Sequence, residues 1–183
     1  MVRYAAKRLG EHKFYIYTNS KKTHINFYVS ESLEKIVEKR VQFIVDHQQY
    51  HRVGSHLDGA YLIYDNKEEK MIYDQQIPDH NACRERFAMP LLIARYLQNH
   101  KAPKAYASLM RFVEFMKREV VDFETGEVFD SEGKDRERIR LYNAPWAITL
   151  MAELYTLTME DEYLEVLYRA VKFYYGQGGA KFY

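Results

Sequence analysis

The stretch Ile77–Leu97, IPDHNACRERFAMPLLIARYL, changes character halfway along its length. Its first half is polar and charged, whereas its second half is apolar on almost every side when wound as a helix. A helix that is apolar all round belongs in a protein interior. We therefore expect a buried helix, with Pro78 and Asp79 as its start signals and with ionisable side chains gathered at its first turn.

This charged start has two interpretations. The exposed amides of a first helical turn attract anions, so the cluster can mark a binding site. The alternative is an ordinary helix cap with solvated charges. The ionisable and polar side chains concerned are Asp79, His80, Asn81, Arg84, Glu85 and Arg86.

Composition limits the class of protein. A chain of 183 residues allows one ordinary domain, and 17 Tyr and 10 Phe fit either a thick core or a surface that stacks on sugars. The net charge of +1 predicts no nucleic-acid partner, and no apolar run is long enough to predict a membrane span. The first residues lack the apolar core of a signal peptide. The one cysteine, Cys83, is expected to be buried as a small apolar residue rather than activated as a thiol.

Aromatic and β-branched residues at 12–19 and 23–29 predict a β-hairpin. An amphipathic helix follows at about 30–47, and then a long connection, 51–78, with a small hairpin formed by 60–64 and 70–73. Beyond the buried helix, amphipathic helices are expected at 104–121 and 162–175. A second helix that is apolar nearly all round begins near Tyr142 and runs to Leu154. The segment 131–138 is charged and is expected to be solvated.

The two apolar helices align with each other at an offset of 59 residues, which pairs Phe87 with Trp146 and Tyr96 with Tyr155. Each is followed by a short turn and an amphipathic helix. An inner ring of apolar helices inside an outer ring of amphipathic ones produces this order. Repeats of this size need neighbours to bury their faces.

The stretch RLYNAPWAITLMAELYTLTMEDEYL, with DFETGEVFD before it and GGAKFY after it, resembles the six-hairpin glycosidase superfamily of α/α toroids. The likeness is greatest to unsaturated glucuronyl hydrolases and related bacterial polysaccharide-degrading proteins. The fold that this implies is mainly α: a partial α/α toroid, with an N-terminal β-hairpin in residues 1–29 and an incomplete helical domain in 30–183. Members usually close a ring of six helix pairs, so the resemblance favours a fragment.

The resemblance also implies a site at the loop-bearing end of the inner helices, where carboxylates act as general acid and base. Asp79 is the first candidate because it immediately precedes the buried helix, and Asp58 and Asp74 follow. His80 is a candidate for moving a proton or orienting Asp79. For each of these residues, an ordinary role in a turn or cap is the alternative.

Candidate substrate-binding residues lie at both inner-helix starts. Arg84 and Arg86 can bind a uronate carboxylate through two parallel hydrogen bonds, unless they pair with Glu85 or an acidic loop. Tyr142 and Trp146 offer flat faces for a sugar ring, with plain core packing as the alternative.

No metal site and no cofactor are predicted, because His47, His51 and His56 match no metal-binding spacing and no phosphate or dinucleotide loop occurs. Two classes of function remain. One is a glycoside hydrolase (or a lyase or epimerase) acting on an acidic oligosaccharide. The other is a non-catalytic helical-repeat module that binds a partner along its helices.

Overall fold

The computed structural model describes residues 3–73, 83–136 and 140–181, together with the backbone but not the side chains of Cys83 and Arg84. The chain divides into two compact units, Met1–Lys39 and Arg40–Tyr183, which we call the N-terminal unit and the helical unit. The domain boundary predicted between residues 29 and 30 stays a prediction.

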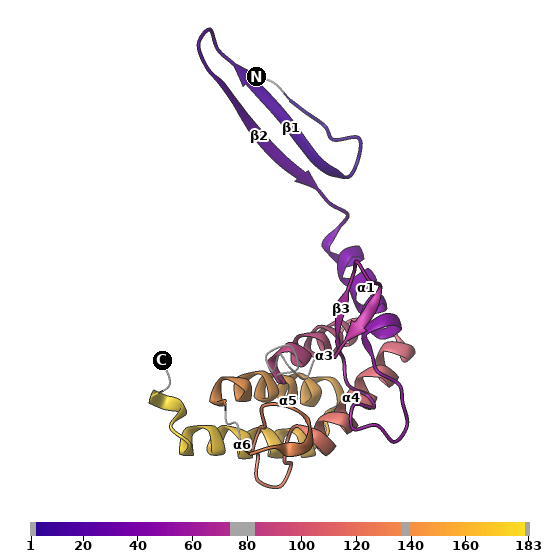
Figure 1. Ribbon diagram of the computed structural model, residues 1–183, viewed down its shortest axis with the longest axis vertical. Helices are drawn as coiled ribbons and strands as arrows, with labels where there is room; N and C mark the ends of the chain where they lie inside the picture. The colour runs from indigo at the N-terminus through magenta and orange to yellow at the C-terminus, as the bar shows by residue number, and fades with distance from the viewer. Residues whose placement is uncertain (1–2, 74–82, 137–139, 182–183) are drawn as a thin grey trace. The chain divides into compact units, whose positions relative to one another are not determined.

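The N-terminal unit contains the predicted hairpin. Strands β1 (Gly10–Tyr17) and β2 (Lys22–Val29) pair antiparallel, with Gly10 opposite Val29 and Tyr17 opposite Lys22 (Figure 1). At the turn, β1 ends two residues earlier than expected and β2 begins one residue earlier. The amide of Thr18 donates to the carbonyl of Lys21 at 2.9 Å and closes a tight connection.

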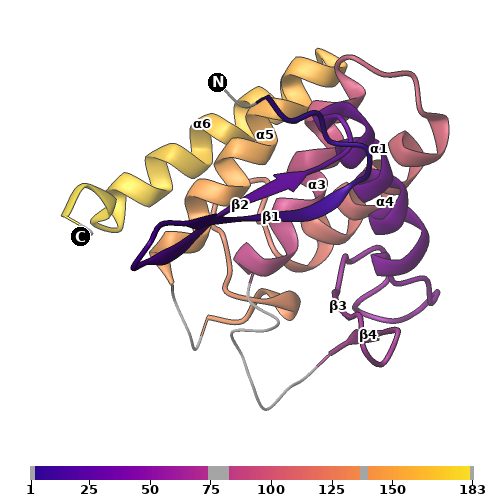
Figure 2. The same cartoon turned by 90° about the horizontal axis from the view of Figure 1, so that it is seen from above.

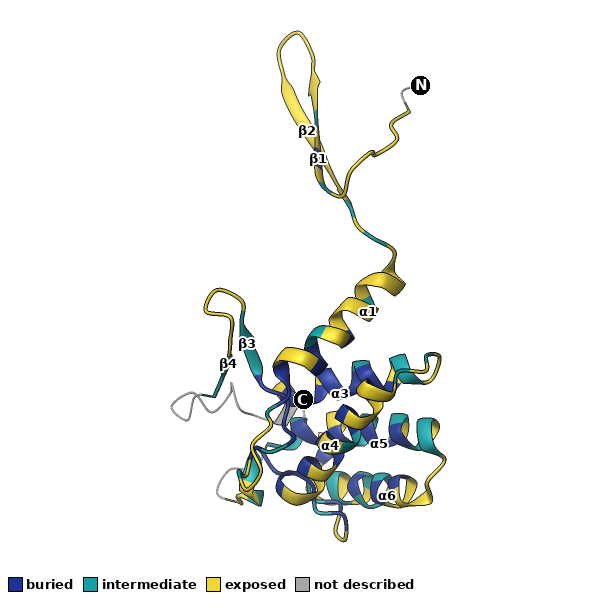
Figure 3. Cartoon of the chain, turned by 90° about the vertical axis from the view of Figure 1, so that its right-hand side faces the viewer, coloured by how far each residue is buried: buried dark blue, intermediate teal, exposed yellow. Residues whose placement is uncertain are grey.

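One face of this hairpin carries a small apolar cluster. The ring of Phe14 lies 4.5 Å from that of Tyr4 and 5.7 Å from that of Phe27, measured between centroids. His12, which is buried, donates from Nε2 to the carbonyl of Arg8 at 2.8 Å and accepts from the Tyr4 hydroxyl at 2.7 Å. Two strands alone supply little core, and most of both strands is exposed (Figure 3).

Helix α1 (Leu33–Phe43) ends sooner than its periodicity predicts and passes into a π-helical turn, η1 (Ile44–Gln48). The wider turn places two consecutive glutamines in the interior. Gln48 donates to the carbonyl of Leu62 at 2.9 Å, and Gln49 donates to the carbonyl of Ser108 at 2.8 Å. The turn therefore fixes the following loop against α4 (Pro103–Glu119).

The small hairpin predicted in the long connection is confirmed as strands β3 (Ile63–Asp65) and β4 (Lys70–Ile72). The Asp65 carboxylate accepts the amides of Lys67 and Glu68, at 2.8 and 3.1 Å, and so closes the turn between them.

Two helical hairpins form the body of the helical unit. The first joins α3 (Cys83–Leu97) to α4, and the second joins α5 (Ala144–Thr158) to α6 (Asp161–Gly176). Helices α3 and α5 lie side by side and run in the same direction (Figures 1 and 2). Near their C-terminal ends, Glu153 accepts from Arg95 and Gln98, each at 2.7 Å. The predicted mainly α class is confirmed.

The core lies where these helices meet the loop before β3. Tyr61 stacks on Phe112 at 5.1 Å, and Phe87 meets the same ring edge-on at 5.6 Å. Helix α3 is buried on most sides, as expected. Helix α5 is not, since Trp146 in its first turn is 40% exposed. Among the described residues, no helix is both long and apolar enough to cross a membrane.

The loop between α4 and α5 is held close to α6. Val121 and Val128 form an isolated antiparallel bridge around Gly126, which has a φ of 79°. A β-carbon at Gly126 would lie 2.3 Å from the backbone nitrogen of Ala170. Only glycine allows this approach, and it positions the short helical turn η2 (Glu132–Lys134).

Candidate functional site

Several loops gather at one end of the helical unit. The starts of α3 and α5, the β3–β4 hairpin and η2 all lie toward the lower side of Figure 2. Helices α3 and α5 run in the same direction, so the loops that precede them emerge at the same end. The polar side chains of these loops are therefore the ones that can form a site.

At this end, four side chains converge on the carboxylate of Glu132. Its Oε1 accepts a hydrogen bond from the Tyr73 hydroxyl at 2.5 Å and lies 4.0 Å from Nε2 of His56. Its Oε2 accepts from Nη2 of Arg86 at 3.1 Å and from the hydroxyl of Ser131. We call Glu132, Arg86, Tyr73 and His56 the Glu132 cluster. Its members come from the residue after β4, from α3, from η2 and from the loop before β3.

The cluster is graded from buried to exposed. The side chain of Arg86 is 3% exposed, that of Glu132 13% and that of His56 54%. Burial alone would raise the pKa of Glu132. The hydrogen bonds from Ser131 and Tyr73 and the charge of Arg86 outweigh it, and the net result is a lowered pKa. Glu132 is therefore ionised at neutral pH.

A second set of contacts joins the loop before β3 to η2. Arg118 Nη2 donates to the carbonyls of His56 and Asp58 at 3.1 and 3.0 Å, and its Nε donates to Glu119 at 2.6 Å. The other oxygen of Glu119 accepts the amide of Gly133 at 3.1 Å. These bonds fix the backbone on both sides of the Glu132 cluster.

A third group lies before α5. Asn143, fully buried, donates to the Asp130 carboxylate at 2.8 Å, and Arg140 approaches the same carboxylate at 3.6 Å. Arg140 also donates to the Tyr142 hydroxyl at 2.7 Å. In the part of the chain that the structure describes, Oδ1 of Asn143 has no hydrogen-bond partner.

The sequence-based candidates fall in different places. Asp79, Asp74 and His80 lie outside the described residues, as does the side chain of Arg84. Asp58 is half-buried, and its carboxylate accepts the amide of Arg52 at 3.2 Å, as in an ordinary turn. Arg86 lies inside the Glu132 cluster. Tyr142 is half-buried beside Arg140, and Trp146 is partly exposed in the first turn of α5.

Sequence analysis missed Glu132, Tyr73 and His56 as site residues. The expectation that 131–138 is a solvated charged run is wrong for Glu132. Its side chain is largely buried, where it pairs with Arg86 and accepts a hydrogen bond from Tyr73. The contacts join residues 46 and 59 positions apart, so no local pattern shows them. One signal for a buried acidic partner is present in the sequence: the helical periodicity places Arg86 on the side that faces the interior, where a charge needs a partner.

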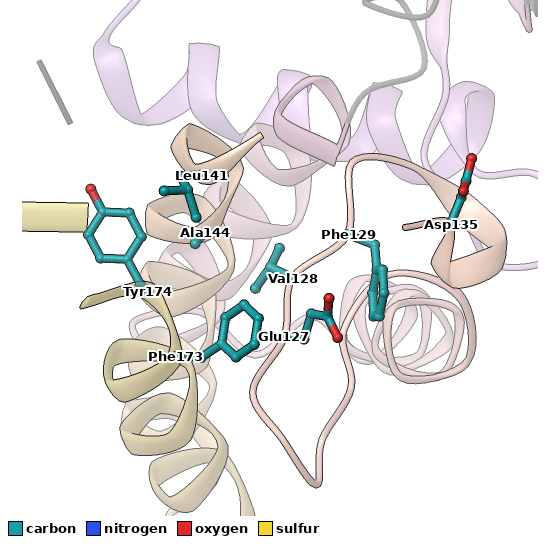
Figure 4. A pocket seen from close by; sticks show the side chains of 8 residues that line it. All are labelled: Glu127, Val128, Phe129, Asp135, Leu141, Ala144, Phe173 and Tyr174. Atoms are coloured by element: carbon teal, nitrogen blue, oxygen red, sulfur yellow. The ribbon is translucent and has the colours of Figure 1, made fainter. Parts of the chain in front are cut away.

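A pocket beside this loop is too small for a sugar. It lies between the 127–135 loop and the facing ends of α5 and α6, where Phe173 and Tyr174 approach Val128 and Ala144 (Figure 4). Its free volume of about 10 Å³ holds no more than one water molecule. The contact anchors the loop that carries Glu132.

Among the described side chains, no group of three or more His, Cys, Asp and Glu residues can hold a metal ion. The side chains of the Glu132 cluster are themselves groups that can transfer protons. An ionised carboxylate shares one oxygen between a phenol and an imidazole, and a buried guanidinium holds the other oxygen.

No protein-family model matches the sequence, and no curated protein matches it. A solved structure of a polysaccharide lyase is similar to this chain, with a TM-score of 0.89 and 28% sequence identity. The similarity covers 96% of this chain and 27% of that lyase. The chain therefore has a fold that occurs in a polysaccharide-degrading enzyme, and it spans about a quarter of that enzyme's length.

Proposed function

We propose that this chain is part of an enzyme that cleaves a uronate-containing polysaccharide by β-elimination, and that its helical hairpins belong to an α/α toroid. The observation that carries the proposal is the arrangement around Glu132, where Tyr73 and His56 share one carboxylate oxygen at the loop-bearing end. The similarity to a polysaccharide lyase supports the choice of reaction class.

Elimination needs a base and an acid on neighbouring bonds of the sugar. The base removes the proton from the carbon that bears the carboxylate, a double bond forms to the next carbon, and the glycosidic C–O bond there breaks. The acid protonates the departing oxygen. In this proposal His56 takes the carbon-bound proton and Tyr73 protonates the leaving oxygen. The proton then returns from His56 to Tyr73 along the Glu132 oxygen that faces both.

Arg86 is a positioning residue in this scheme, whereas Glu132 both orients Tyr73 and passes on the returning proton. Arg86 is buried against Glu132, and an ionised Glu132 holds the Tyr73 hydroxyl in one orientation. Arg84, two residues before Arg86 in the same helix, keeps its proposed role of binding the uronate carboxylate. Trp146 and Tyr142 keep theirs as platforms for the sugar rings.

Hydrolysis by a pair of carboxylates is the alternative reaction. It needs one protonated carboxyl group, whereas the pKa of Glu132 is lowered. The acids proposed for hydrolysis are Asp79 and Asp58, with His80 beside the first. Elimination is favoured because the described side chains around Glu132 offer a phenol and an imidazole rather than a second carboxyl group.

The products separate the two reactions. The full chain is incubated with a soluble polyuronate, and both reducing ends and the ultraviolet absorbance of an unsaturated uronate are recorded. Elimination raises both, whereas hydrolysis raises reducing ends alone. Tyr73→Phe should lower the rate about 100-fold or more because it removes the proton donor. The matched control is Tyr64→Phe, on the partner strand of the same small hairpin, and it should keep the rate. Binding without turnover would instead favour the non-catalytic helical module.

A further inference from the structure

The N-terminal hairpin has a charge that the whole-chain value conceals. Residues 1–29 contain six Lys and Arg side chains and one Glu, a net charge of +5. Residues 30–183 contain 21 basic and 25 acidic side chains, a net charge of −4, so the two parts nearly cancel in the total of +1. The hairpin segment is strongly basic, and it favours anionic ligands.

The two faces of this hairpin differ in chemistry. Side chains alternate along a strand, and the register places Tyr15 opposite His24 and Tyr17 opposite Lys22. One face, which we call the tyrosine–lysine face, carries Lys13, Tyr15, Tyr17, Lys22, His24 and Tyr28, together with Asn26 and, at the end away from the turn, Glu11. The opposite face carries Phe14, Ile16, Ile25 and Phe27. Only the tyrosine–lysine face combines aromatic rings with positive charge.

Lys22 is held among the rings of this face. Its Nζ lies 4.2 Å from the centroid of Tyr15 and 5.3 Å from that of Tyr17, and the two rings are 6.3 Å apart. Cation–π attraction fixes the ammonium beside the rings without using its hydrogen-bond donors. An anion that stacks on a tyrosine therefore finds a donor already in place.

The N-terminal unit by itself leaves these rings accessible. Tyr15 is 48% exposed, Tyr17 65% and Tyr28 79%, and Figure 3 shows both strands as largely exposed. Exposed aromatic patches of this kind mark interaction sites. A two-stranded hairpin is also barely stable in water, so a ligand that bridges both strands stabilises it.

We propose that the tyrosine–lysine face is a second binding surface for a uronate-containing polysaccharide, separate from the Glu132 cluster. The apolar C–H face of a sugar ring stacks on tyrosine, and its carboxylate pairs with Lys22 or Lys13. The choice of ligand rests on the proposed function. Single-stranded nucleic acid also combines flat rings with negative charge, and the test below separates the two.

The test is calorimetric titration of the full chain with a homopolymeric uronan at low salt. Lys22→Gln and Tyr17→Leu should each weaken binding about fivefold, because each removes a contact of roughly 1 kcal/mol. Lys101→Gln, at an exposed turn of the helical unit, and Phe27→Leu, on the opposite hairpin face, are the matched controls and should leave the affinity unchanged. Affinity should also fall as NaCl is added.

Backbone amide shifts of β1 and β2 in the wild-type chain provide a measurement that needs no variant, and they should move on titration. Unchanged affinity in Lys22→Gln and Tyr17→Leu overturns the proposal. So does equal affinity for a neutral glucan, or tighter binding of a single-stranded oligonucleotide. A wild-type chain that binds through Lys22 but cleaves nothing overturns the proposed function and leaves this surface standing.

Discussion

At the scale of single residues, the largely buried carboxylate of Glu132 matters for stability because buried groups depend on its charge. Its carboxylate holds a buried guanidinium, a phenol and a serine hydroxyl. Removing one member of such a group leaves the others buried without compensation, which costs more than an exposed ion pair gains. The cluster therefore contributes to stability whatever its part in catalysis.

The lowered pKa of Glu132 gives this contribution a pH dependence. A carboxyl group whose folded pKa lies below its ordinary value of 4.5 stabilises the fold fully above that value. The stabilisation is lost as the pH falls through the folded-state pKa. We expect Glu132→Gln to lower the free energy of unfolding by about 2 kcal/mol at pH 7, and the difference from wild type to shrink below pH 4.5.

Urea unfolding at a series of pH values measures this difference. Glu165→Gln is the control, because Glu165 makes an exposed pair with Arg169 one turn away and should change stability little at any pH. A gap between wild type and Glu132→Gln that stays constant down to acid pH would show that Glu132 is not ionised in the folded chain.

At the scale of elements, the helices are the part that sequence analysis predicts well. Apolar side chains repeat with helical spacing through α3, α4, α5 and α6. The observed helices begin and end within a few residues of the expected positions. Helix α1 is the exception, since its last turn widens to bury Gln48 and Gln49. That change depends on partners more than ten residues away, which local periodicity does not encode.

Gly126 tests how closely one element approaches another. Gly126→Ala places a β-carbon against the backbone of α6 and keeps an unfavourable φ of 79°. Gly54→Ala is the matched control, with a φ of 82° but nothing within 4 Å. Backbone strain costs about 1 kcal/mol in both, and the clash should cost Gly126→Ala at least about 2 kcal/mol more.

Chemical denaturation of the two alanine variants provides the comparison. Because the two glycines have nearly the same φ, the difference between the variants measures mainly the close approach to Arg169 and Ala170. Equal stability of both variants would mean that the 121–128 loop can move away from α6 without cost.

At the scale of the whole molecule, the two units are stabilised differently. The helical unit buries large side chains such as Phe112, Leu109 and Met116 completely. The N-terminal hairpin has two strands and one small aromatic cluster. The sequence indicates both parts, but only the register shows that the lysines and tyrosines of the hairpin share one face.

Hydrogen exchange should reveal this contrast directly. Amides of β1 and β2 are expected to exchange orders of magnitude faster than those of α4, since a hairpin without a core opens at little cost. Exchange followed by mass spectrometry on the free chain measures both together. Equal protection of β1 and α4 would contradict this expectation and would indicate that something covers the hairpin.

The pairing of α3 with α5 has a consequence for how such chains change in evolution. Glu153 joins the two helices at an offset of 58 residues from Arg95, close to the spacing at which their sequences align. The two helical hairpins therefore meet with corresponding positions of α3 and α5 beside each other. In-frame duplication of a gene segment of this length would produce such a pair, because each copy would bring the same positions of its first helix to the contact.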